Sequence, residues 1–146
     1  MNQYQNRNQR PKHQQQNAIS MINQEIKNNQ QPLSHFFTKE DLYLPDHKAY
    51  KIADALQDLN VNQLRKIFDM IGKAAMLSKE NKFDLALENL FMVVPMAAYA
   101  TGRQLIKPKD FNDFIQLVIT PNKIRSNEDI QTLFKLMQTI LAYKKK

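Results

Sequence analysis

Eight basic side chains are the residues of this sequence whose types and spacing could do chemistry. They fall on the expected outer faces of helices and at helix ends, where lysine and arginine can bind phosphate groups. The eight are Lys48, Lys51, Arg65, Lys66, Arg103, Lys107, Lys109 and Arg125. No recognised module presents base-reading aromatic side chains, so this chemistry is contact with a sugar-phosphate backbone without sequence readout. The competing interpretation is an ordinary solvated surface, and Arg103, just past a helix end, could instead bond exposed carbonyls.

The balance of charge favours a polyanionic partner. The 146 residues hold 21 Lys and Arg against 14 Asp and Glu, a formal net charge of +7. A field of this sign attracts nucleic acid, acidic proteins or anionic lipid, although many basic proteins have no nucleic-acid role. Charge alone does not separate these partners, so the placement of the charges matters more.

No arrangement typical of an enzyme accompanies these residues. The sequence has no cysteine, which excludes disulfides, thiolate metal sites and cysteine nucleophiles. His35 and His47 lack a second histidine or a carboxylate three or four residues on, as a metal-binding pair would need. There is no P-loop or glycine-rich phosphate cradle. We therefore expect no catalysis, no metal, no cofactor and no small-molecule substrate.

Two pairs of neighbouring acids have a structural explanation. The pairs are Glu40 with Asp41 and Glu128 with Asp129. Both lie where the first turn of a helix favours negative charge. Thr38 and Ser126 precede them at the spacing of a capping box. Capping therefore accounts for these carboxylates without a metal.

The basic residues need a rigid scaffold, and the sequence predicts one made of helices. Apolar residues recur at helical spacing, and no stretch alternates apolar and polar residues as a strand would. The expected main helices span about 46–58, 60–78, 83–103, 108–120 and 126–144, with Asp46 and Asn60 as N-caps of the first two. Short connections favour a single compact all-α bundle of about five main helices.

The most apolar of these helices is expected at residues 83–103. Apolar residues cover nearly its whole circumference, which is typical of a helix inside a bundle, so we expect the other helices to pack around it. Pro95 cannot donate to the Phe91 carbonyl, so the helix should kink or break there. Gly102 suits a left-handed cap.

Residues 1–33 are expected to form a disordered basic tail ahead of a helical domain at residues 34–146. About half of the first 31 residues are Asn or Gln, and such a segment buries too little apolar area to offset its ordering entropy. Ile19, Ile22 and Ile26 could form a weak amphipathic turn or two. A solvated tail is preferred to a dedicated RNA-binding arm.

The sequence also favours a soluble, cytoplasmic protein with no membrane contact. No basic segment followed by an apolar one opens the chain as in a signal peptide. The longest apolar run is interrupted by Glu88, Asn89 and Pro95, which breaks it as a membrane span.

Four local patterns occur in an order that resembles a known family. Residues 59–66, LNVNQLRK, resemble the Leu-Thr-Thr-x-x-(Leu or Ile)-Arg-Lys helix opening of the small subunit of type III-A CRISPR effector complexes, the Csm small subunit. Residues 90–103, ending YATGR, resemble its apolar helix that breaks before Ala-Tyr-x-x-Gly-Arg. Residues 134–144, ending ILAYK, are similar to its C-terminal signature, and residues 50–54, YKIAD, to its first helix.

This resemblance implies a noncatalytic helical protein, present in several copies along the inner filament of a ribonucleoprotein. Such subunits contact crRNA and target RNA through sugar and phosphate. They also contact the large subunit, the backbone subunits and neighbouring copies of themselves. By position the resemblance makes Lys51, Arg65, Lys66 and Arg103 RNA-facing, while Lys48, Lys107, Lys109 and Arg125 rest on charge alone.

Two other functions stay open at this point. One is a helical protein-protein interaction adaptor with no direct RNA role, whose charge serves only solubility. The other is a nuclease assembled from distant residues, although no carboxylate cluster suggests its metal site.

Overall fold

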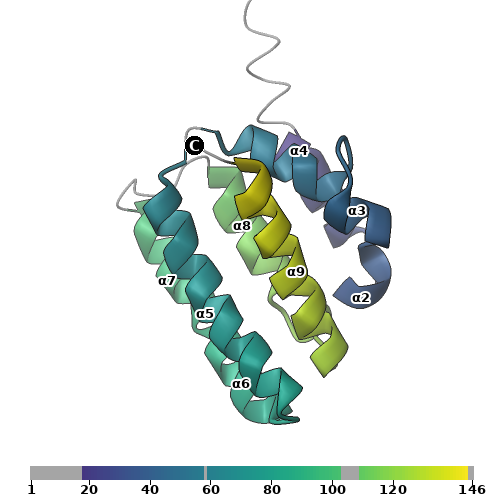
Figure 1. The fold of residues 1–146 in the computed structure, drawn as a ribbon, viewed down its shortest axis with the longest axis vertical. Coiled ribbons are helices and arrows are strands. Elements are labelled where there is room, and N and C mark those ends of the chain that lie inside the picture. The colour runs from purple at the N-terminus through teal and green to yellow at the C-terminus, as the bar shows by residue number, and fades with distance from the viewer. Residues whose placement is uncertain (1–17, 58, 103–108, 145–146) are drawn as a thin grey trace, which may run out of the picture.

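Helices form every regular element in the part of the chain that the computed structural model describes, residues 18–57, 59–102 and 109–144 (Figure 1). An N-terminal helix covers residues 18–27. It is followed by α2 (Leu33–Phe36), α3 (Lys39–Tyr43), α4 (Lys48–Ala55), α5 (Val61–Lys79), α6 (Phe83–Phe91), α7 (Val93–Gly102), α8 (Lys109–Val118) and α9 (Asn127–Lys144). The all-α prediction is confirmed.

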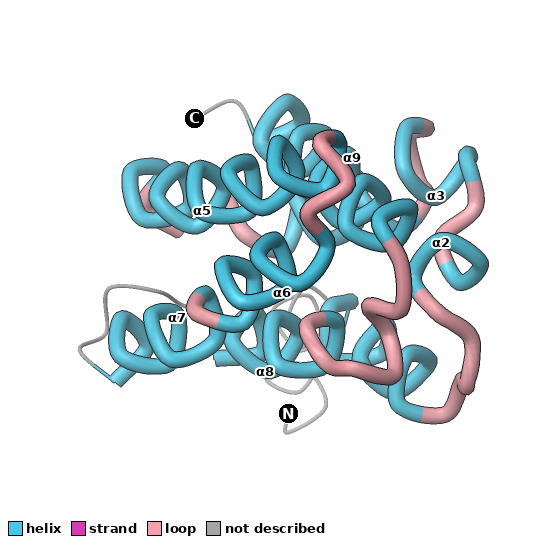
Figure 2. The backbone as a smooth tube through the Cα atoms, turned by 90° about the horizontal axis from the view of Figure 1, so that it is seen from below, coloured by secondary structure: helices cyan, strands magenta, loops and turns pink. Residues whose placement is uncertain are grey.

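The C-terminal helix α9 lies at the centre of the bundle. It contacts α2, α3 and α4 on one flank and α5 on the other, and both views show it between them (Figures 1 and 2). Its buried apolar residues recur three or four positions apart, which puts them on one side of the helix. They are Ile130, Leu133, Leu136, Met137 and Ile140. This stripe is regular enough to specify a central helix.

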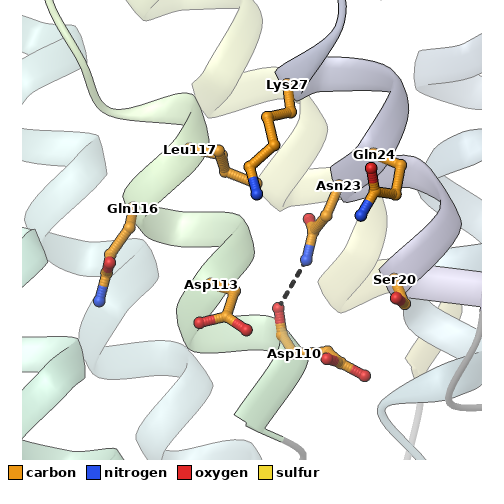
Figure 3. A pocket seen from close by; sticks show the side chains of 8 residues that line it. All are labelled: Ser20, Asn23, Gln24, Lys27, Asp110, Asp113, Gln116 and Leu117. Carbon is orange, nitrogen blue, oxygen red and sulfur yellow. Dashed lines mark hydrogen bonds between the residues drawn. The ribbon is translucent and has the colours of Figure 1, made fainter.

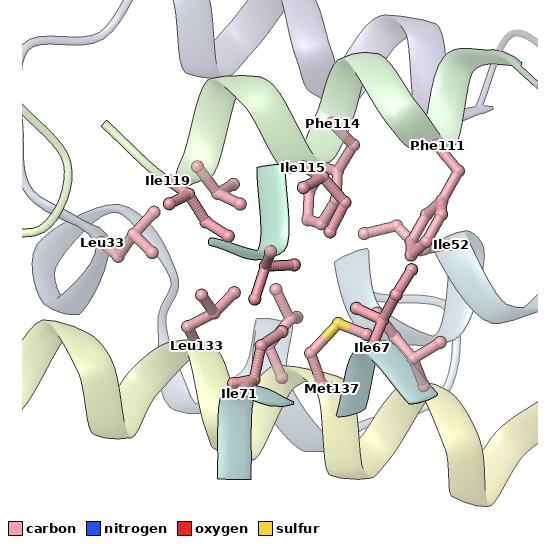
Figure 4. Packing of buried hydrophobic residues seen from close by; sticks show 14 of the residues in the cluster. Leu33, Ile52, Ile67, Ile71, Phe111, Phe114, Ile115, Ile119, Leu133 and Met137 are labelled. Carbon is pink, nitrogen blue, oxygen red and sulfur yellow. The ribbon is translucent and has the colours of Figure 1, made fainter. Parts of the chain in front are cut away.

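Part of the core fills the space between α8 and α9, where side chains of other helices also enter (Figure 4). Figure 4 shows Phe111, Phe114 and Ile115 of α8 directed toward Leu133 and Met137 of α9. All five side chains are fully buried. Aromatic and branched side chains of this size supply most of the apolar area that a bundle buries.

The prediction that residues 83–103 lie at the centre of the bundle is wrong. In α6 and α7, Leu85 is 48% exposed, and Met92 and Met96 are each 54% exposed. The helix α6 contacts α5, and α7 contacts α5 and α8. An apolar circumference therefore did not predict that the helix is buried, because side chains such as Leu85, Met92 and Met96 face outward.

The predicted break in this segment is present but lies before Pro95. The helix α6 ends at Phe91, and α7 begins at Val93. Pro95 is in the first turn of α7, where a missing N–H group costs little. Gly102 has no positive φ, so its predicted left-handed cap is wrong.

Residues 83–102 also form the one stretch of the described chain that could cross a membrane by length and composition. Only 22% of that window is buried. The stretch consists of two helices separated at Met92, and both lie at an edge of the bundle (Figure 1).

The N-terminal helix is part of the core, so the predicted tail boundary at residue 33 is wrong. Ile19, Ile22 and Ile26 are at most 4% exposed. Their spacing of three and four residues makes one apolar stripe, whose burial outweighs the polar composition around it. Residues 1–17, where the rest of the predicted disorder falls, lie outside the described residues.

Three of the four expected helix N-caps are present, including the bond from the Ser126 N–H to Asp129 before α9. Thr38 and Asp41 form both bonds of a capping box at α3. The Asn60 side chain accepts a hydrogen bond from the Asn62 N–H at the start of α5. The predicted Asp46 cap of α4 is wrong, because Asp46 adopts a φ of 67° and His47 takes the capping position without a side-chain bond.

Candidate nucleic-acid interface

The outer face of α5 carries four exposed basic side chains. They are Arg65, Lys66, Lys73 and Lys79. Asp69 is the one acid among them, and none of the four forms an ion pair with a described residue. On the opposite side, Leu64, Ile67 and Ile71 are buried and hold the helix rigidly in the bundle. The face is therefore a fixed row of available positive charges.

Arg65 and Lys66 lie on different flanks of this face. Phe68, one turn after Arg65, stacks on Phe134 of α9 with ring centroids 5.2 Å apart, so Arg65 points toward the α9 side. Lys66 is the next residue of the helix, so it points about 100° away from Arg65 around the helix axis. A polyanion crossing α5 could contact both.

On α4 the structure separates the two predicted lysines. Lys51 is exposed and has no ion-pair partner among the described residues. The Lys48 ammonium lies 3.4 Å from a Glu25 carboxylate oxygen and 3.5 Å from one of Asp41, with the Phe36 ring centroid 5.3 Å away. Lys48 is therefore a link between the N-terminal helix, α3 and α4, and only Lys51 is free for a phosphate.

Arg125 is also occupied by the protein. Its guanidinium donates to the Asn122 carbonyl at 2.7 Å, to the Asn122 side chain at 3.0 Å and to the Gln30 carbonyl. The neighbouring Lys123 is buried, and its ammonium donates to the Gln31 carbonyl at 2.9 Å. Burial, and then the positive charge of Arg125, lower the pKa of Lys123. These two side chains fasten the loop before α9 to the segment that follows the N-terminal helix.

The remaining predicted residues do not join one site. Lys109 is exposed at the start of α8, whose main contact is with α7. Arg103 and Lys107 lie outside the described residues. Lys51 on α4 and Arg65 and Lys66 on α5 are therefore the exposed predicted cations without a described ion-pair partner, with Lys109 apart from them on α8.

Sequence reasoning missed Lys135 as a candidate. It is exposed on α9, the helix that contacts both α4, which carries Lys51, and α5, which carries Arg65. Lys135 lies off the apolar stripe formed by Leu133 and Met137, so helical periodicity alone could have predicted that it is exposed.

A pocket of about 430 Å³ lies elsewhere, between the N-terminal helix and α8. Figure 3 shows Asp110 and Asp113 of α8 beside Asn23 and Lys27. The Asn23 amide donates to the Asp110 carbonyl at 3.1 Å. Two carboxylates against one ammonium oppose a bound phosphate, so this pocket is not part of the candidate interface.

One of these carboxylates makes stability depend on pH. Burial, and then the charge of Asp113, raise the pKa of Asp110, with Lys109 acting in the other direction. A raised folded-state pKa favours folding below pH 3.8, the ordinary value, and this contribution is lost as pH rises through the folded pKa. Asp110→Asn should therefore have a higher Tm than the wild type at pH 7, and the difference should disappear near pH 3. Thermal unfolding from pH 3 to 7 measures this.

The matched control is Asp84→Asn, at the same first-turn position of α6. First-turn acids interact favourably with the helix dipole, so this variant should lose a little stability at pH 7. Equal effects of the two substitutions would contradict the assignment to burial and to Asp113.

No group of three or more His, Cys, Asp or Glu side chains that could hold a metal ion occurs within residues 18–57, 59–102 and 109–144. The acids predicted to cap helices behave as caps at α3 and before α9.

Comparison with known proteins completes the description of the chain. The family model for Csm2 Type III-A matches residues 39–146, from the start of α3 onward. A protein of Streptococcus thermophilus, "CRISPR system Cms protein Csm2", is 28% identical over 85 residues, which cover 58% of this chain and 69% of that protein. No solved structure matches. The N-terminal helix and α2 precede the matched part.

Proposed function

The chain belongs to the Csm2 family of type III-A CRISPR small subunits, and on that premise we propose that it binds crRNA and target RNA through their sugar-phosphate backbones. Membership in a Csm complex implies crRNA and other Csm subunits as partners. Within this proposal the protein has no catalytic role and acts in the cytoplasm. It contacts the large subunit, the backbone subunits and neighbouring copies of itself.

The observation that carries the proposal is the pair Arg65 and Lys66. Both are exposed on a 19-residue helix whose other side is buried, and neither is neutralised by a described carboxylate. Cations held on a rigid helix bind phosphates at low entropic cost and without regard to base sequence. Lys135 on α9 and Lys51 on α4 add exposed positive charges on the side of α5 that faces α9.

Reversal of both charges should weaken RNA binding without regard to sequence. The complex carrying Arg65→Glu/Lys66→Glu should bind target RNA at least about tenfold more weakly than the wild-type complex, because each copy loses two phosphate contacts and gains two repulsions. The slope of log K against log salt concentration should fall by about 2 for each copy. Equilibrium binding of labelled target RNA at several salt concentrations, with two unrelated guides, measures both.

The control reverses two exposed lysines outside α5, as Lys39→Glu/Lys82→Glu, of which Lys82 follows the end of α5 opposite to Arg65 and Lys66. This complex should assemble normally and keep most of its affinity, although the net charge changes by the same amount. If the α5 variant assembles and binds RNA as tightly as this control, the site assignment fails. The adaptor role without RNA contact would then take its place.

A further inference from the structure

The α6–α7 edge of the bundle has an apolar groove bordered by acids. Leu87, Phe91, Met92 and Pro95 line the groove. Asp84 and Glu88 also line it, one turn apart on α6, and neither forms an ion pair with a described residue. Exposed apolar surface that is rimmed by charge is typical of a protein contact.

The C-terminal half of α5 has a pattern of charges complementary to that of the groove. Met76 is 63% exposed and lies three residues from Lys73 on one side and from Lys79 on the other. The groove is an apolar centre with two negative charges, and this ridge is an apolar centre with two positive charges. Complementary charges around an apolar contact select both the partner and its orientation.

We propose that the groove on α6–α7 binds the ridge formed by Lys73, Met76 and Lys79 on α5 of a second copy. In this contact the thioether of Met76 enters the groove, and the two lysines meet Asp84 and Glu88. The inference deepens the proposed function and rests on it, because it identifies the surfaces by which neighbouring copies meet.

A symmetric contact of groove against groove is disfavoured by charge. It would bring Asp84 and Glu88 of both copies together, and like charges across an interface oppose association. A ridge-to-groove contact is heterologous, so each copy keeps one ridge and one groove free for the next copy. Such contacts build an open stack and not a closed dimer, which suits a subunit present in several copies.

Self-association of the full-length protein, without RNA, tests the contact. Sedimentation equilibrium at low salt and up to about 1 mM protein covers the range in which weak contacts are populated. The wild type should associate, with a sedimenting mass that continues to rise with concentration. Lys73→Glu/Lys79→Glu and Asp84→Lys/Glu88→Lys should each weaken association at least about tenfold. All four affected side chains are exposed, and circular dichroism checks that each variant is folded.

The variant that combines all four substitutions is the decisive test of the contact. Because it exchanges the charges of ridge and groove, it should associate within about threefold of the wild type. A wild type that stays monomeric, a ridge reversal without effect, or a fourfold variant as weak as the doubles would each overturn the proposal. The proposal would also be overturned if Asp84→Lys/Glu88→Lys self-associated normally but no longer entered the Csm complex. The groove would then bind another subunit.

Failure here and failure of the RNA proposal are distinguishable. The contact is measured on purified protein, whereas RNA binding is measured on the assembled complex with substitutions in the other half of α5. If association follows the charges but the Arg65→Glu/Lys66→Glu complex keeps its RNA affinity, only the RNA role is rejected. The reverse pattern rejects only the contact between copies.

Discussion

Replacement of Asp129 by alanine should lower the free energy of unfolding by about 3 kcal/mol or more. The side chain is 1% exposed, and its carboxylate accepts hydrogen bonds from the N–H groups of Ser34 and Arg125, both at 2.8 Å. The Ser126 N–H, at 3.1 Å, is a third donor. Alanine would leave these donors without their acceptor in a partly buried site. Thermal unfolding should show a loss of about 10 °C in Tm.

The neighbouring acid provides the control for this prediction. Glu128 is also in the first turn of α9, but it is exposed. Glu128→Ala should cost less than about 1 kcal/mol, because it removes only a favourable interaction with the helix dipole. If the two alanine variants unfold at the same temperature, Asp129 is only a first-turn charge and does not connect α2 to α9.

Long-range contacts explain why the network around Asp129 was not predicted. The spacing of Ser126 and Asp129 indicates a local cap, and that cap is present. The bond from Ser34 joins residues 95 positions apart, and no local pattern signals it. The same reason accounts for Arg125, which meets the Gln30 carbonyl from a similar distance along the chain.

The helices themselves were predictable because their signal is local. In α5 and α9 the apolar residues repeat at helical spacing, so both the helices and their exposed faces follow from sequence. That is why Arg65 and Lys66 were correctly expected on an outer face. Lys48 was expected there too, but Glu25 neutralises it from a helix that was expected to be a disordered tail. Errors in the site thus follow from errors in the fold.

The burial of two segments could not be derived from local sequence patterns. An apolar circumference favoured a central position for residues 83–103, yet Met92 and Met96 face outward. Their exposure depends on how many partners surround the segment, and partners from other chains do not appear in one sequence. In the N-terminal region the average composition concealed a short apolar stripe that the other helices bury.

Removal of that stripe should have the second large effect on stability. Ile26 is 1% exposed in the N-terminal helix, outside the part of the chain that matches the family. Ile26→Ala should lower the free energy of unfolding by about 2–5 kcal/mol, because it removes buried apolar area and leaves a cavity. The expected loss in Tm is roughly 6–15 °C. Thermal and denaturant unfolding of the full-length protein measure it.

Met21→Ala is the matched control, since Met21 belongs to the same helix and is 63% exposed. It should change stability by no more than about 0.5 kcal/mol. If both variants are equally mild, the helix does not dock, and the contacts of Glu25 with Lys48 and of Asn23 with α8 are lost with it. If Ile26→Ala has the expected effect, the folded unit begins before the family match. The side-chain ends of Lys123 and Arg125 are then held by protein carbonyls, which leaves the proposed RNA contact to the exposed cations of α4, α5 and α9.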